Sequence, residues 1–141
     1  MNPPVVHYRI SHWMYYHHMR HLSRIYDWMG RLLYSCFVPG SAQIGKNFKL
    51  AYWGLGVVVH TRTIMGDNCK LGQNVTIGGK GGGVPQLLNN VYIGGGSFVF
   101  GGITIGNNVT VGANSVVNKD VPDNAIVAGV PAKIIRIKEE Q

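Results

Sequence analysis

An aliphatic residue recurs at every sixth position over a long stretch of this chain. In the C-terminal half the repeat runs through Ile93, Val99, Ile105, Val111 and Val117. A helix needs apolar residues every three to four positions and a half-buried strand needs them every two, so a period of six fits neither element alone. Such a fixed period is typical of a solenoid. The sequence therefore predicts short strands joined by tight corners, with three units per triangular turn and an apolar column inside.

The same phase extends back toward the N-terminus, with two interruptions. Leu50 and Val59 lie nine positions apart, and Ile77 and Leu87 lie ten apart. The extra residues fall within AYWGLGVV and within GGKGGGVPQ, and the second set predicts an extruded loop at about 78–86. Insertions into single repeats are often binding loops. We expect the coil to span residues 37–137, followed by a C-terminal tail at 138–141.

The first 36 residues lack the period of six, and their pattern predicts a helical cap on the coil. Ser23 is a candidate N-cap for an apolar stripe at helical spacing. That stripe comprises Ile25, Trp28, Met29, Leu32 and Leu33. An uncovered end of a solenoid would expose strand edges and bare core. We therefore predict two short amphipathic helices that cover the first turn.

Histidines and cysteines in the chain do not predict a metal site. The spacing of His17, His18 and His21 puts at most two imidazoles on one helix face, with no acidic or cysteine partner near them. A packed or surface histidine cluster is the favoured interpretation. Cys36 and Cys69 are too few for a disulfide framework, and Cys69 falls in an inward position. Buried thiols indicate a reducing cytoplasm.

Length and charge narrow the remaining possibilities. The chain has 141 residues, which suits one domain, and a net charge of +7. Residues 1–49 carry six basic residues against Asp27 alone. This excess fits a solvated basic face, a membrane-surface face or an anion-binding face. Nucleic acid is disfavoured because no known binding motif is present. The chain shows no apolar core of a signal peptide and no run of about 18 apolar residues.

Several segments resemble the hexapeptide-repeat acyltransferases. They are IGKNFKL, LGQNVTIGGKGGG and above all the closing SVVNKDVPDNAIVAGVPAKI. The resemblance covers about residues 36–137 and is strongest to the serine acetyltransferase-like branch, which includes short O-acetyltransferases of polysaccharide gene clusters. It implies a mainly β fold, a left-handed parallel β-helix, that assembles as a homotrimer. It also implies that acetyl-CoA lies in the groove between neighbouring coils.

The resemblance further implies which residues contact acetyl-CoA. The family's contacts correspond here to Gly79, Lys80, Gly95, Ala113 and Lys133. Lys80, Lys133 and Arg136 are the cations that we expect near the CoA phosphates. Glycines at corners would also let a thin pantetheine chain lie close to the backbone.

The catalytic base is harder to assign. In serine acetyltransferases the catalytic histidine belongs to an Asp-His-Ala-Thr-Gly loop, and the matching loop here, AYWGLG, has Tyr52 and Trp53 in its place. His60 is the one histidine in the coil, and it points outward because it follows the inward Val59. We predict His60 as general base, on the side where the inserted residues emerge. Tyr52 and Trp53 would then form aromatic walls for an acceptor. The alternative is a histidine that packs at a subunit seam.

These features predict an acetyl-CoA-dependent O-acetyltransferase. The favoured acceptor is a sugar hydroxyl of a glycan precursor, which attacks directly in a ternary complex because Cys69 points inward. Serine O-acetyltransferase is one alternative, and a non-catalytic scaffold or binding solenoid is another. A zinc carbonic anhydrase is excluded because the coil offers one histidine instead of three. The positive charge of the N-terminal half is also compatible with peripheral contact with a membrane.

Overall fold

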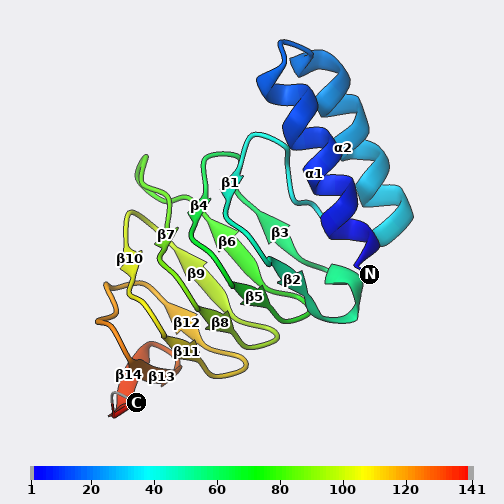
Figure 1. Cartoon of the computed structure of the whole chain (residues 1–141). Coiled ribbons are helices and arrows are strands. Elements are labelled where there is room, and N and C mark those ends of the chain that lie inside the picture. The colour runs from blue at the N-terminus through cyan, green and yellow to red at the C-terminus, as the bar shows by residue number, and fades with distance from the viewer. Residues whose placement is uncertain (1, 140–141) are drawn as a thin grey trace.

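The computed structural model, which describes residues 2–139, is a parallel β-helix with a helical hairpin at its N-terminal end (Figure 1). The strands of each face stack in parallel from the hairpin as far as β13 (Ala125–Gly129). The predicted solenoid is confirmed. Within the described residues, neither helix is both long enough and apolar enough to span a bilayer.

Two helices form the cap. The α1 helix (Pro3–Tyr16) and the α2 helix (Arg20–Tyr34) lie side by side at the start of the coil (Figure 1). The prediction that Ser23 caps the second helix is wrong, because α2 begins one turn earlier, after Met19. Ser23 is instead fully buried inside the helix pair, where its hydroxyl donates to the carbonyl of Ser11 at 3.1 Å.

Three sheets form the faces of the coil, and all of their strands pair in parallel except β14 (Ala132–Ile137). Sheet A contains β3 (Val58–Val59), β6 (Thr76–Gly78), β9 (Phe98–Phe100) and β12 (Val116–Val117). Sheet B contains β1 (Gln43–Ile44), β4 (Ile64–Met65), β7 (Gln86–Leu87) and β10 (Thr104–Ile105). Sheet C contains β2 (Lys49–Leu50), β5 (Lys70–Leu71), β8 (Tyr92–Ile93), β11 (Thr110–Val111), β13 (Ala125–Gly129) and β14 (Ala132–Ile137).

Each circuit of the chain visits sheets B, C and A in that order, so the coil has three edges. We name them the BC, CA and AB edges after the sheets that they join. The short 3₁₀ segment η1 (Ala51–Gly54) lies at the CA edge, between β2 and β3. The extruded loop, residues 79–85, lies at the AB edge, between β6 and β7. These edges hold the residues from which a functional site can be built.

The second residue of each two-residue strand points into the coil. Val59, Ile77, Val99 and Val117 stack in register along sheet A and are almost completely buried. Corresponding columns line the inner faces of sheets B and C, so the period of six places one aliphatic residue in each strand. Both cysteines are buried free thiols, as predicted.

Asparagine side chains form a ladder along the BC edge. Asn68, Asn90, Asn108 and Asn124 each adopt a positive φ of about 60°, a conformation that asparagine tolerates better than most residues. The amides of Asn68, Asn90 and Asn108 each donate to the next asparagine at 3.0–3.1 Å, and Asn47 donates to Asn68 at 2.9 Å. Because each side chain satisfies its neighbour in the next turn, the ladder fixes the stacking of the corners.

The C-terminal strands close the coil. After β13, the chain turns back and β14 pairs with it antiparallel at the end of sheet C. Lys138, in the predicted tail, donates from Nζ to the carbonyl of Asn108 and to Thr110 Oγ1, both at 2.8 Å. Residues 140 and 141 of the predicted tail lie outside the described residues.

Candidate active site at the coil edges

His60 lies at the AB edge, immediately after β3, against the extruded loop. A Cβ placed on Gly79 would lie 3.2 Å from His60 Nε2, so the imidazole packs directly over this glycine. The backbone N–H of Arg62 donates to His60 Nδ1 at 3.1 Å. This contact favours the neutral tautomer that carries its proton on Nε2. His60 therefore presents an N–H group toward the loop.

The extruded loop is a tight hairpin. Lys80 and Gly83 exchange two backbone hydrogen bonds at 2.9 and 3.0 Å. Gly81 and Gly82 between them have φ values of +59° and +83°, which a type I′ turn requires at both central positions. The Lys80 ammonium lies 5.3 Å from the centre of the Phe100 ring on the outside of sheet A. The loop thus holds one cation over sheet A, at the edge that also carries His60.

Arg62 connects His60, the loop and a cleft. Its guanidinium donates from Nη2 to the carbonyl of Gly82 at 2.9 Å. Arg62 and Thr61 also line a cleft of about 380 Å³ between α2 and the first turn of the coil. The other lining residues are Tyr15, Arg24, Asp27, Trp28, Phe37, Pro39 and Ser41. Sequence reasoning missed this cleft, although Arg62 follows His60 by only two positions.

Asp27 is the acidic residue of the cleft, and it is committed to structural contacts. Ser11 Oγ donates to one carboxylate oxygen, and the backbone N–H of Gly40 donates to both at 3.2 Å. Burial raises the pKa of Asp27, and the two hydrogen bonds oppose that rise. Because these contacts occupy the Asp27 carboxylate, the positive charges of Arg24 and Arg62, which line the cleft, suit an anionic ligand group.

The CA edge holds the other group of predicted residues. Tyr52 and Trp53 lie in η1 with φ values of 50° and 53°, and this left-handed backbone turns their side chains outward. Tyr52 is 78% exposed. Gly95 and Ala113 occupy successive corners below them, where the N–H of Asn114 donates to the carbonyl of Gly95 at 2.9 Å. The edge thus places Gln73, Gly95 and Ala113 at successive corners beneath two aromatic residues.

One chain does not bring the predicted site residues together. His60, Gly79 and Lys80 share the AB edge, whereas Tyr52, Trp53, Gly95 and Ala113 share the CA edge. Lys133 and Arg136 are both exposed on β14 of sheet C. The expectation that His60 lies on the side where the inserted residues emerge is wrong. Strand β3 crosses sheet A between η1 and His60, so the two lie on opposite edges of that sheet.

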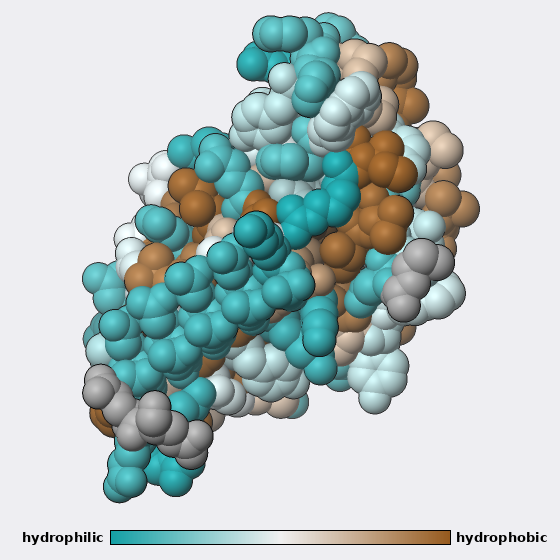
Figure 2. Space-filling model, in the orientation of Figure 1, coloured by the Kyte–Doolittle hydropathy of each residue, from teal (hydrophilic) through white to brown (hydrophobic). Residues whose placement is uncertain are grey.

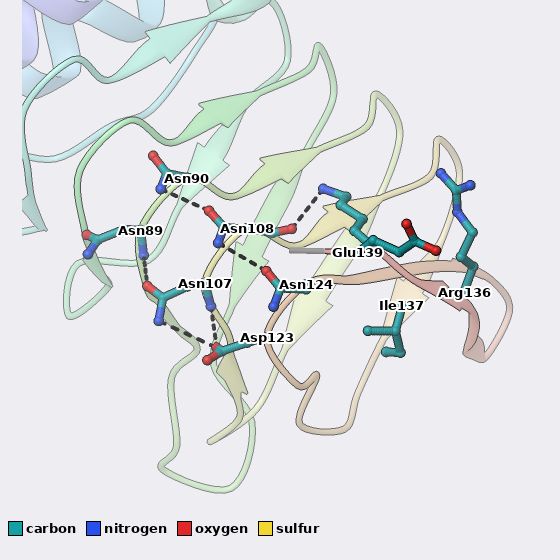
Figure 3. Close-up of a pocket in the computed structure, with 10 residues that line it drawn as sticks. Asn89, Asn90, Asn107, Asn108, Asp123, Asn124, Arg136, Ile137 and Glu139 are labelled. Atoms are coloured by element: carbon teal, nitrogen blue, oxygen red, sulfur yellow. Dashed lines mark hydrogen bonds between the residues drawn. The ribbon is translucent and has the colours of Figure 1, made fainter. Parts of the chain in front are cut away.

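The BC edge carries an open polar hollow of about 1160 Å³ (Figure 3). Its walls are the asparagine ladder and a second row in which Asn89 and Asn107 bond to the next corner. Arg136 borders the hollow, whereas Lys133 does not. The hollow offers amides but no imidazole or thiol. Within residues 2–139, no three metal-ligating side chains gather in one place.

Comparison with known proteins identifies the family. No family model matches the chain. A serine acetyltransferase of Synechococcus elongatus is 38% identical over 132 residues, which is 91% of this chain and 54% of that protein. A serine acetyltransferase of Helicobacter pylori is 33% identical over 91% of this chain and 77% of that protein. The chain belongs to the serine acetyltransferase family.

A solved member of the family supports the assignment in three dimensions. The serine acetyltransferase of Brucella abortus in complex with coenzyme A matches 96% of this chain with a TM-score of 0.90 and 29% identity. This chain covers 55% of that one, and it spans little more than half the length of most of the curated relatives it matches. These relatives are named serine acetyltransferases, and none of them supports the branch of polysaccharide O-acetyltransferases that the sequence suggested.

Proposed function

We propose that this chain is an acetyl-CoA-dependent O-acetyltransferase. The observation that carries the proposal is the match, over nearly its whole length, to a serine acetyltransferase solved with coenzyme A. Features of the fold also support the proposal. The glycine-rich edges would admit a thin pantetheine arm, the exposed cations would meet the phosphates of coenzyme A, and an imidazole lies beside a cleft.

Direct transfer from donor to acceptor is the proposed route. Acetyl-CoA supplies a thioester carbonyl, which a hydroxyl attacks while a base takes its proton. The C–S bond then breaks, the acetyl group stays on the acceptor oxygen, and coenzyme A leaves as the thiol after the protonated base returns the proton to its sulfur. An acyl-cysteine intermediate is disfavoured because both thiols are buried. Burial raises the pKa of Cys36 to about 11 and also raises the pKa of Cys69. Neither sulfur is therefore a ready nucleophile at neutral pH.

A homotrimer would unite the two edges that one chain keeps apart. Sheet A lies between the CA and AB edges, and its outer face carries Val58 and Phe98, each 41% exposed. Apolar side chains of this kind are typical of a protein interface. If a second copy packs there, Gly95 and Ala113 of one chain approach Gly79 and Lys80 of the next. Acetyl-CoA would then lie in the groove between two coils, with Lys133 and Arg136 as further phosphate partners.

His60 is the proposed general base. To accept a proton at Nε2, its ring must turn over or its Nδ1 contact with Arg62 must open when substrates bind. His60→Ala should therefore lower turnover by about 10²-fold or more while CoA binding is retained. His60→Gln, which keeps a polar group of similar size, should not restore activity if proton transfer is the role. Full activity in both variants would remove His60 from the chemistry.

Serine is the acceptor that the comparisons favour, because the relatives are named serine acetyltransferases. The cleft beside the AB edge supports a small acceptor with a carboxylate, since Arg24 and Arg62 face it. A sugar hydroxyl is the second candidate. Its support is the exposed Tyr52 and Trp53, which replace the Asp-His pair of the family loop and offer flat surfaces for a sugar ring.

An acceptor screen tests the proposal. The purified protein would be incubated with acetyl-CoA and, separately, serine, homoserine, and a panel of sugars and sugar nucleotides. Free thiol and the mass of the acetylated product would both be followed. The account predicts acceptor-dependent thiol release, with O-acetylserine as the favoured product. Coenzyme A binding without transfer to any hydroxyl would instead support a non-catalytic solenoid.

A further inference from the structure

The α2 helix is packed with its polar side inward. Ser23, Asp27 and Gly30 are its buried residues, and they face α1 and the first turn of the coil. The exposed residues include most of its large apolar side chains: Leu22, Ile25, Trp28, Met29, Leu32 and Leu33. A surface helix of a globular protein normally turns its apolar stripe toward the core. The sequence predicted such a helix, and the structure corrects the direction in which its stripe faces.

The α1 helix extends this apolar surface. Its contacts with α2 include Ser11, described above, and His7, which stacks on Tyr26 at 3.9 Å and donates to the Tyr26 carbonyl. Its contact with the coil is made by Tyr8, whose hydroxyl donates to the Ala42 carbonyl at 2.6 Å. The remaining side of the helix exposes Val6, Ile10 and Trp13. We call the exposed apolar residues of both helices the outer cap face, and hydrophobic side chains gather over this hairpin in Figure 2.

Only positive charge borders the outer cap face. Arg20 and Arg31 are exposed on α2, on the flank of the apolar stripe, and Arg24 is exposed on the same flank where it also lines the cleft beside the coil. Two of them lie over aromatic rings: Arg20 is 5.2 Å from the centre of Tyr15, and Arg31 is 5.1 Å from that of Phe37. Asp27 is the sole acidic residue between positions 2 and 66, and it is buried. The surface of the cap therefore combines a wide apolar stripe with unbalanced cationic side chains.

We propose that the outer cap face binds an anionic lipid surface, with both helices lying in the plane of the interface. A helix with a marked apolar face, low overall hydrophobicity and flanking arginines is typical of such interfacial elements. Trp13 and Trp28 suit the boundary between headgroups and acyl chains. The arginines suit acidic headgroups, to which each cation near the surface adds attraction. Neither helix is suited to span the bilayer.

A second copy of the chain is a poorer occupant of the same face. Two cap faces in contact would bring their arginines close together, and neither would supply an exposed carboxylate to compensate. Like charges across an interface oppose association. An anionic membrane offers both an apolar layer and the missing negative charge. The charge pattern of the cap thus favours lipid over self-association.

The experiment measures binding of the whole protein to vesicles by cosedimentation. Vesicles of pure phosphatidylcholine are compared with vesicles that contain phosphatidylglycerol, at low and high salt. Leu32→Glu changes the most exposed side chain of the face, at 69%, and Ile135→Glu on β14 is its matched control, at 67%. We expect binding to anionic vesicles only, weakened by salt, reduced about tenfold by Leu32→Glu and unchanged by Ile135→Glu. Arg20→Gln should weaken binding less, by about fivefold.

Three outcomes would overturn the proposal. The first is absence of binding to anionic vesicles by wild-type protein whose circular dichroism shows it to be folded. The second is an equal loss of binding in Leu32→Glu and Ile135→Glu. The third is a sedimentation coefficient that falls in Leu32→Glu at unchanged vesicle binding, because the face would then be an interface between copies. An unchanged sedimentation coefficient with reduced binding supports the lipid surface.

Discussion

In the coil, the side chains that point inward are aliphatic, whereas those enclosed by the cap are largely polar. Ile93 and Val99 are completely buried on successive faces of the coil. In the cap, Ser11, Ser23 and Asp27 are buried together and bonded to one another or to the backbone. The coil therefore derives its stability from apolar burial along its whole length. The cap relies on satisfied polar contacts and leaves its apolar surface available for other contacts.

The largest expected difference between the two regions is the loss of stability when an aliphatic side chain is shortened. Ile93→Ala should lower the free energy of unfolding by about 2–5 kcal/mol, because it opens a cavity in the packed column. Leu32→Ala should change it by no more than about 0.5 kcal/mol, because Leu32 is exposed. Denaturant unfolding followed by circular dichroism measures both. Equal losses would mean that the outer cap face is covered in the isolated protein.

The corners of the coil allow a second test. Asn90→Ala should cost about 1–2 kcal/mol, since alanine is strained at the positive φ of this corner and the ladder loses two bonds. Asn90→Gly keeps the backbone conformation and loses only the bonds, so its cost should be smaller. Thermal unfolding of both variants separates strain from hydrogen bonding. A larger loss of stability in Asn90→Gly than in Asn90→Ala would contradict this account of the ladder.

A smaller effect is expected at the AB edge. In Gly79→Ala the new methyl group meets the His60 ring at 3.2 Å and displaces it by a few tenths of an ångström. Acetyl transfer should fall by about tenfold, with little change in the free energy of unfolding. Gly102→Ala, one turn further along the same edge, makes an ordinary 3.4 Å contact with Gly83 and serves as control. Equal rates of acetyl transfer in the two variants would show that catalysis does not depend on the position of the His60 ring.

The smallest effect is a pH dependence in the cap. Burial raises the pKa of Asp27 above its usual 3.8, so the native state binds this proton more tightly than the unfolded chain does. The free energy of unfolding should therefore fall as pH rises from about 3.8 through the raised pKa. Asp27→Asn should remove this part of the dependence, whereas Glu139→Gln, at an exposed residue, should retain it. Identical pH profiles in all three proteins would refute the assignment.

The two regions also differ in how well the sequence predicts them. Each coil repeat places its aliphatic residue in the same environment, so counting positions was enough to assign the inward column and the extruded loop near residue 79. In the cap, the spacing of Ile25, Trp28 and Leu32 correctly indicated a shared helix face. The spacing carried no information on whether that face is buried, because burial depends on which other part of the molecule packs against the helix. Burial of Asp27 and Ser23 decided the orientation instead.

The candidate site was predicted only in part for a related reason. The outward direction of His60 follows from its place after Val59, and the structure agrees. Its separation from Tyr52 and Trp53 could be found only by assigning each strand to a sheet. Arg62 was missed because an isolated arginine at a corner looks like an ordinary solvated charge. The bond from its guanidinium to the Gly82 carbonyl depends on the extruded loop folding back over the edge.

Titration of coenzyme A into the purified protein by calorimetry tests the central claim most directly, because every proposed acceptor requires this donor. We predict saturable binding of one coenzyme A per chain, with a Kd between about 1 μM and 1 mM, weakened by Lys133→Glu. No heat beyond dilution at millimolar coenzyme A, with the protein folded, would contradict the assignment of an acetyl-CoA site to these edges.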